Sequence, residues 1–159
     1  MAALPRPLLV LALLAYSVHE HQGGHARRAE VWLRPDSFTL QDDGRGIGLH
    51  KAGYVEALMG ILVGGPGAVQ LHGVGLALVA ASTPRLDVES RRGGSLWQQS
   101  FAWGVANGPP VQQPASDDTG TRITFVGASA STEIEAAALD AQIAVWRARH
   151  PGLEIVVHR

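Results

Sequence analysis

An acid followed by two glycines stands in the segment of this chain best suited to chemistry, Gln41-Asp42-Asp43-Gly44-Arg45-Gly46-Ile47. A strand-like run precedes it, so we expect Asp42 at the end of a strand. A carboxylate in that position can accept hydrogen bonds from a buried donor, while Gly44 and Gly46 let the backbone turn and approach a ligand closely. The same composition also occurs in ordinary turns, so the segment alone does not define a site.

Two later segments carry groups that could complete a binding site. The first is Leu71-His72-Gly73-Val74-Gly75-Leu76, which comes just before an apolar run. Its backbone N–H groups would lie at the start of a helix, where unpaired donors and the helix dipole favour an anion such as phosphate. The second is Thr119-Gly120-Thr121-Arg122, in which Thr121 is either an ordinary strand residue or a hydroxyl directed at a ligand.

In this order the three segments resemble the nucleotide-binding motifs of the GHKL (Bergerat-fold) ATPases, and in particular the N-terminal ATPase domain of the B-type subunits of DNA gyrase and topoisomerase IV. The resemblance extends from about Leu9 to the C-terminus. It implies that Asp42 accepts a hydrogen bond from the adenine amino group, partly through a water also held by Thr121. It further implies that Gly44 and Gly46 bring the backbone close to the nucleotide.

The resemblance assigns roles to two arginines as well. Arg45 matches an arginine that stacks on the adenine side of the pocket together with a proline after the isoleucine. Here Ile47 is followed by Gly48 instead. Arg91 matches an arginine at the pocket mouth that can contact aminocoumarin-type inhibitors, although a solvated arginine at a strand end is the alternative interpretation.

The phosphate-binding part departs from the family pattern. By resemblance, backbone N–H groups of His72, Gly73, Val74 and Gly75 would bind phosphate. The family usually has two more glycines before the leucine, in a lid that covers the triphosphate, and Val69 and Gln70 stand there in this chain. The segment 48–71 is also short, so we expect a weaker phosphate grip.

The hydrolytic residues of the family are missing from the first helix. The glutamate that activates water and the asparagine that ligates Mg²⁺ correspond to Ala12 and Tyr16. No acidic residue occurs in residues 1–19, and Glu20 lies about 12 Å beyond Ala12 along a helix. We therefore expect no catalytic residue and no metal ligand, which puts Mg²⁺ binding in doubt.

Composition sets wider limits on function. The 159 residues suit one domain with a sizeable core, and a net charge of −1 gives no reason to expect strong nucleic-acid or membrane binding. The absence of cysteine excludes disulfides and thiolate zinc sites. His19, His21 and His25 are an alternative metal site, but His19 and His21 point to different helix faces.

The elements that must position these residues form an α+β two-layer sandwich, with a mixed, mostly antiparallel sheet and helices on one face. Apolar spacing predicts helices over residues 8–22, 51–63, 74–82 and 132–149. Strands are predicted over residues 29–33, 37–41, 85–91, 95–103, 119–125 and 153–158, with 105–116 as a loop or edge strand.

Periodicity also predicts which side chains are buried. Alternation places Trp97, Phe101 and Trp103 on one core-facing side of a strand. In the last helix, Ile134, Ala138, Ala141 and Val145 form an apolar stripe. Thr132 is predicted to cap that helix, with Glu135 three residues later as in a capping box.

The apolar run 8–15 has two interpretations. It is either the first core helix or the apolar region of a secretory signal, and it is too short to span a membrane. We favour the helix and expect a cytoplasmic protein, with secretion left open.

The sequence thus predicts a single ATP-binding domain over residues 1–159, with hydrolysis impaired. Its expected ligand is an adenine nucleotide, and a protein partner is left open. One alternative is an active ATPase of the type II topoisomerase kind, with its base from another residue or a partner chain. The other is a non-enzymatic interaction module that keeps only the fold.

Overall fold

The computed structural model describes residues 5–48, 79–114, 117–127 and 133–159. Its elements follow one another as α1 (Arg6–Gln22), β1 (Arg28–Leu33), β2 (Ser37–Asp42), β3 (Arg85–Arg92), β4 (Ser95–Ala102), β5 (Val105–Ala106), β6 (Val111–Gln113), β7 (Gly120–Val126), α4 (Glu133–Arg149) and β8 (Glu154–His158). Residues 79–81 are also helical. No helix among the described residues is long and apolar enough to cross a membrane.

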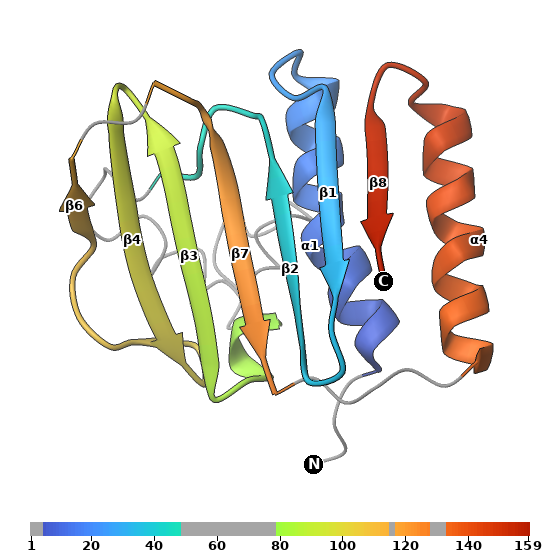
Figure 1. The fold of residues 1–159 in the computed structure, drawn as a ribbon, viewed down its shortest axis with the longest axis horizontal. Helices are drawn as coiled ribbons and strands as arrows, with labels where there is room; N and C mark the ends of the chain where they lie inside the picture. The colour runs from blue at the N-terminus through green and yellow to red at the C-terminus, as the bar shows by residue number, and fades with distance from the viewer. Residues whose placement is uncertain (1–4, 49–78, 115–116, 128–132) are drawn as a thin grey trace, which may run out of the picture.

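One mixed sheet organises these elements (Figure 1). Its strand order is β5-β4-β3-β7-β2-β1-β8, and β6 pairs with β4. Neighbouring strands are antiparallel except β1 and β8, which run parallel. Helices α1 and α4 contact each other, α1 contacts β2 and α4 contacts β8. The predicted α+β sandwich is confirmed.

Helix α1 and the central strands build the core. Leu9, Val10, Leu13 and Leu14 are buried on α1, and burying each such side chain stabilises the fold by roughly 1.5–3 kcal/mol. On β2, buried and half-buried residues alternate, so Phe38, Leu40 and Asp42 share the side that faces the helix. The prediction of a core helix over this apolar run is confirmed.

The predicted aromatic face of β4 is wrong at one residue. Phe101 is buried and Trp97 packs against the core, but Trp103 is 62% exposed. The strand ends at Ala102, and Trp103 has a positive φ of 51°. Alternation holds only while the backbone stays extended, so it does not extend into this turn.

The predicted apolar stripe of α4 is also wrong. Leu139 and Ile143 are the buried residues of this helix, whereas Ile134 is 84% and Val145 41% exposed. Helix α4 carries two apolar faces, and its larger side chains, including the partly buried Trp146, pack against the core. Burial of more apolar area explains why this face is turned inward.

Several predictions lie outside the described residues. These are the helix over 51–63, most of the helix over 74–82, and the cap at Thr132. The remaining predicted helices and strands occur with boundaries shifted by up to two residues, and 105–116 contains the edge strands β5 and β6.

Candidate functional site

Asp42 lies where α1, β2 and β7 meet. It is the last residue of β2, it is 2% exposed, and it pairs in register with Thr121 of β7. Its Oδ1 accepts hydrogen bonds from the Gly44 N–H at 2.9 Å and the Thr121 N–H at 3.4 Å. Its Oδ2 accepts one from Ser17 Oγ of α1 at 2.7 Å. The carboxylate therefore ties together three parts of the chain.

Burial raises the pKa of Asp42 to about 6, because removal from water disfavours the charged form. The hydrogen bonds from Ser17, Gly44 and Thr121 act in the opposite direction. The nearby charge of Glu20 raises the pKa slightly further. Near neutral pH the group is mostly ionised and acts as an acceptor only.

Thr121 holds the glycine loop against the sheet. Its side chain is fully buried, and its Oγ1 accepts a hydrogen bond from the Ile47 N–H at 2.8 Å. Gly46 has a φ of +86°, and a Cβ there would lie 2.6 Å from the Arg91 carbonyl oxygen. Only glycine fits this close approach. The structure thus brings together the predicted residues Asp42, Gly44, Gly46, Ile47 and Thr121.

Arg45 contacts a residue that the sequence did not assign to the site. Its Nη2 lies 2.9 Å from Glu20 Oε2, and its backbone N–H and Nε donate to Oε1 of the same carboxylate. Glu20 is only 3% exposed, and a Cβ on Gly44 would lie 3.3 Å from it. Glu20 therefore positions the loop after Asp42. Its being the only acid in a mostly apolar helix is the signal that could have identified it.

The middle of α1 carries apolar or aromatic groups at the positions expected for catalysis. Ala12 packs against the core, and Tyr16 is 9% exposed. A methyl group and a phenol supply neither the carboxylate of a general base nor an ordinary Mg²⁺ ligand. The residues present at these positions do not fit the metal that the family pattern implies.

The alternative metal site at the histidines of α1 gains no support from their contacts. His21 Nδ1 lies 2.8 Å from the Ala26 carbonyl oxygen, and its ring meets that of His150 edge to face. Within the described parts of the chain, no three His, Cys, Asp or Glu residues are grouped so that they could hold a metal.

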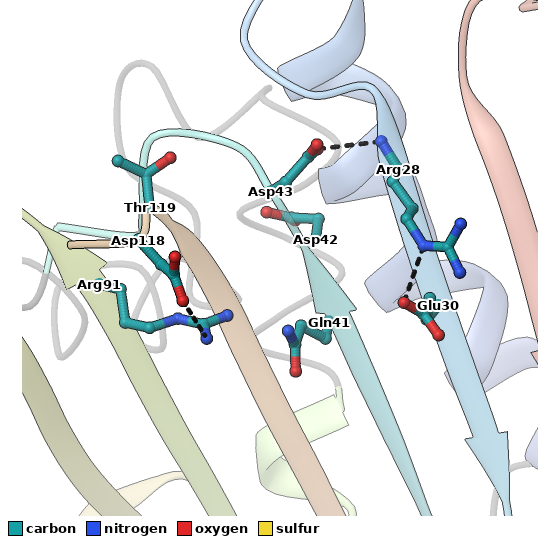
Figure 2. A pocket seen from close by; sticks show the side chains of 8 residues that line it. All are labelled: Arg28, Glu30, Gln41, Asp42, Asp43, Arg91, Asp118 and Thr119. Atoms are coloured by element: carbon teal, nitrogen blue, oxygen red, sulfur yellow. Dashed lines mark hydrogen bonds and ion pairs between the residues drawn. The ribbon is translucent and has the colours of Figure 1, made fainter. Parts of the chain in front are cut away.

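A hollow of about 360 Å³ lies at the same end of the sheet (Figure 2). Its lining includes Gln41 and Glu30, which alternate along their strands with residues that face the core. Arg91 lines it too, 3.8 Å from Asp118. Asp42 reaches its edge, but Gly44, Gly46 and Thr121 do not, so this hollow is distinct from the expected adenine pocket.

The predicted phosphate-binding residues His72, Gly73, Val74 and Gly75 lie outside the described residues. The described part of the site is therefore its base side, formed by α1, the Asp42 loop and β7.

Known proteins are similar to this chain in sequence and in fold. No family model matches it. The gyrase B protein of Micrococcus luteus is 43% identical over 138 residues, which are 76% of this chain and 19% of that protein. The topoisomerase 4 B protein of Staphylococcus aureus is 35% identical over 131 residues, 74% of this chain and 20% of that protein.

The 43K ATPase domain of Thermus thermophilus gyrase B, solved with an aminocoumarin, has the same fold. Its TM-score is 0.77 at 24% identity, over 94% of this chain and 42% of that one. The fold and the motifs define a GHKL-type ATPase domain. Within that class the chain resembles gyrase B and its topoisomerase IV counterpart, as predicted, and it spans about a fifth of the length of the curated relatives it matches.

Proposed function

We propose that this chain binds an adenine nucleotide through Asp42 and Thr121 and hydrolyses ATP slowly or not at all. The observation that carries the proposal is a buried carboxylate without a cationic partner among the described residues. Two carboxylate oxygens offer about four acceptor sites, and the described donors to Asp42 are three. One acceptor site is thus left for an amino N–H of a ligand.

Thr121 supports the same proposal. Its hydroxyl oxygen accepts from the Ile47 N–H, and a hydroxyl can also donate one hydrogen bond. Acceptor and donor therefore stand side by side on β2 and β7, as recognition of a base edge requires. Buried donors and acceptors of this kind discriminate strongly, because a ligand that lacks the matching group leaves them unpaired.

Slow hydrolysis follows from the middle of α1. A general base must lie within about 3 Å of the proton it removes, or reach it through one water. Ala12 cannot take that role. Glu20 is held by Arg45 at the other end of the site, where it orients the Asp42 loop. The nucleotide itself would supply the phosphoanhydride bond, and the described residues of this chain bind and orient its base.

The test is a thermal-shift and calorimetric titration with ATP, ADP and GTP, with and without Mg²⁺. A ligand that binds only the folded state adds about 2.7 kcal/mol of stability at a hundredfold excess over Kd. We expect stabilisation by ATP and ADP, little dependence on Mg²⁺, and none by GTP.

Asp42→Asn should remove this stabilisation, because an amide presents a donor in place of one acceptor. Asp43→Asn is the matched control, since the adjacent Asp43 is exposed and accepts hydrogen bonds from the Arg27 and Arg28 N–H groups. No shift at millimolar ATP would refute nucleotide binding and favour a non-enzymatic interaction module. Steady phosphate release that survives Ala12→Ser would instead favour an active ATPase.

A further inference from the structure

Helix α4 turns a continuous apolar face to solvent. Its opposite face packs into the core through Leu139 and Ile143. On the outward face Ile134 is 84% and Val145 41% exposed. The whole outward stripe consists of exposed apolar residues, namely Ile134, Ala137, Ala138, Ala141, Ala144, Val145 and Ala148. Exposed apolar residues this closely grouped mark an interaction surface rather than ordinary surface variation.

The spacing within the stripe is that of a helix–helix seam. From Ile134, the seam residues follow at Ala138, Ala141, Val145 and Ala148, so the separations alternate between four and three residues. This alternation is the heptad pattern by which one helix packs along another. Three of the five seam residues are alanine, which lets two helix backbones approach closely.

The charges beside the stripe select the partner. Along one flank the order is Glu135, Gln142 and Arg149, from acid through neutral to base. The other flank begins with Glu133 and ends with Arg147, and Asp140 between them is paired with Arg159. Reversing either flank therefore yields its own complement.

We propose that α4 binds α4 of a second copy of this chain, in a symmetric antiparallel pair. A two-fold axis at right angles to the helix brings each flank against its own reversed copy. Glu135 then lies near Arg149 of the second copy, and two Gln142 side chains meet near the middle. A parallel arrangement would instead set acidic ends beside acidic ends.

The position of α4 leaves room for this partner. It lies at one side of the molecule, next to β8 and away from β3 and β4 (Figure 1). The site residues on β2 and β7 are not part of the stripe. The dimer is therefore independent of nucleotide binding, and either proposal can fail without the other.

Sedimentation velocity on the whole chain, from micromolar to near-millimolar concentration without nucleotide, tests the proposal. We expect a concentration-dependent dimer. Val145→Glu should raise the dimer Kd by about tenfold or more, because it places a charge in the seam. Val105→Glu is the matched control, since Val105 is 70% exposed on β5 at the other edge of the sheet. The control should dimerise like the unmodified chain.

A charge exchange tests the antiparallel geometry. Arg149→Glu should weaken the dimer, and adding Glu135→Arg in the same chain should restore it, because both flank contacts are then reversed together. A chain that stays monomeric at near-millimolar concentration overturns the proposal and leaves the stripe to a different protein. Equal effects of the two valine substitutions, or no rescue by the double exchange, overturn it as well.

Discussion

Two regions of helix α1 differ in chemistry although they lie within one element. Its C-terminal part carries Ser17 and Glu20, both buried and both hydrogen-bonded to the segment around Asp42. Its middle carries Ala12 and Tyr16, which pack with the hydrophobic core. In the family pattern the first region belongs to base recognition and the second to hydrolysis.

The first region serves the fold as well as the site, and the second does not need its family residues to fold. Buried polar groups are stable only when they are hydrogen-bonded, so Ser17, Glu20 and Asp42 form one interdependent set. Losing any one leaves partners unsatisfied in the core. A catalytic acid in the middle of α1 has no comparable structural duty, and an alanine or tyrosine there stabilises the helix and the core.

The two buried carboxylates of the first region make a second contrast. Glu20 has the guanidinium of Arg45 as its partner, whereas Asp42 is held by neutral donors among the described residues. Burial raises the pKa of Asp42 to about 6 as a result. Such a group costs stability near neutral pH, which suits a binding role more than a structural one.

The base-recognising region should depend most on Gly120. Its φ is +145°, and a Cβ there would lie 2.1 Å from the Asp42 carbonyl oxygen. Gly120→Ala should reduce the free energy of unfolding by about 3–5 kcal/mol, from strain and overpacking together. Urea unfolding measures this loss. Gly127→Ala is the control, because it also has a positive φ but only ordinary contacts, to Pro84. Equal losses in the two variants would contradict the steric explanation.

Restoring an acid to the middle of α1 tests the hydrolytic region. Ala12→Glu supplies the missing general base, and we expect ATP turnover to rise by about a hundredfold, the lower range for such a group. Phosphate release under saturating ATP measures it, with Ala12→Gln as the control that cannot accept the proton. An increase shared by both variants would show that proton transfer is not the cause.

Asp42→Asn should stabilise the protein at pH 8 by about 2 kcal/mol, in contrast to its effect on nucleotide binding. The folded pKa of about 6 exceeds the unfolded value of 3.8, so the stability contributed by this group is fully present below pH 3.8. It is lost as the pH rises through about 6. Chemical unfolding from pH 3.5 to 8 should show the variant's advantage growing over this range. A constant difference would contradict ionisation of Asp42 as its origin.

Ser17→Ala should have the smallest effect, about 1 kcal/mol of destabilisation at pH 8. Its hydrogen bond lowers the pKa of Asp42, so its removal should raise that pKa further. Carboxyl titration by NMR would detect the shift, and the stability loss should shrink at acidic pH. An unchanged pKa would place the Ser17 hydroxyl outside the network.

Local patterns in the chain were enough to predict its elements and the base-recognising pair. Alternating strands and an apolar first helix follow from periodicity, and Asp42 with Gly44 and Gly46 marks a strand end because acid and glycine suit a close turn. The pairing with Thr121 was predicted from the resemblance and appears as neighbouring positions on β2 and β7.

Contacts between these elements became known only from the tertiary structure. Glu20 and Arg45 are distant in sequence, and their pairing depends on how α1 lies against the β2 loop. Trp103 is exposed because its strand ends one residue earlier. Helix α4 has two apolar faces, and periodicity alone does not rank them. Packing against α1 and β8 buried the face with the larger side chains, because total buried area, a property of the whole fold, determines that choice.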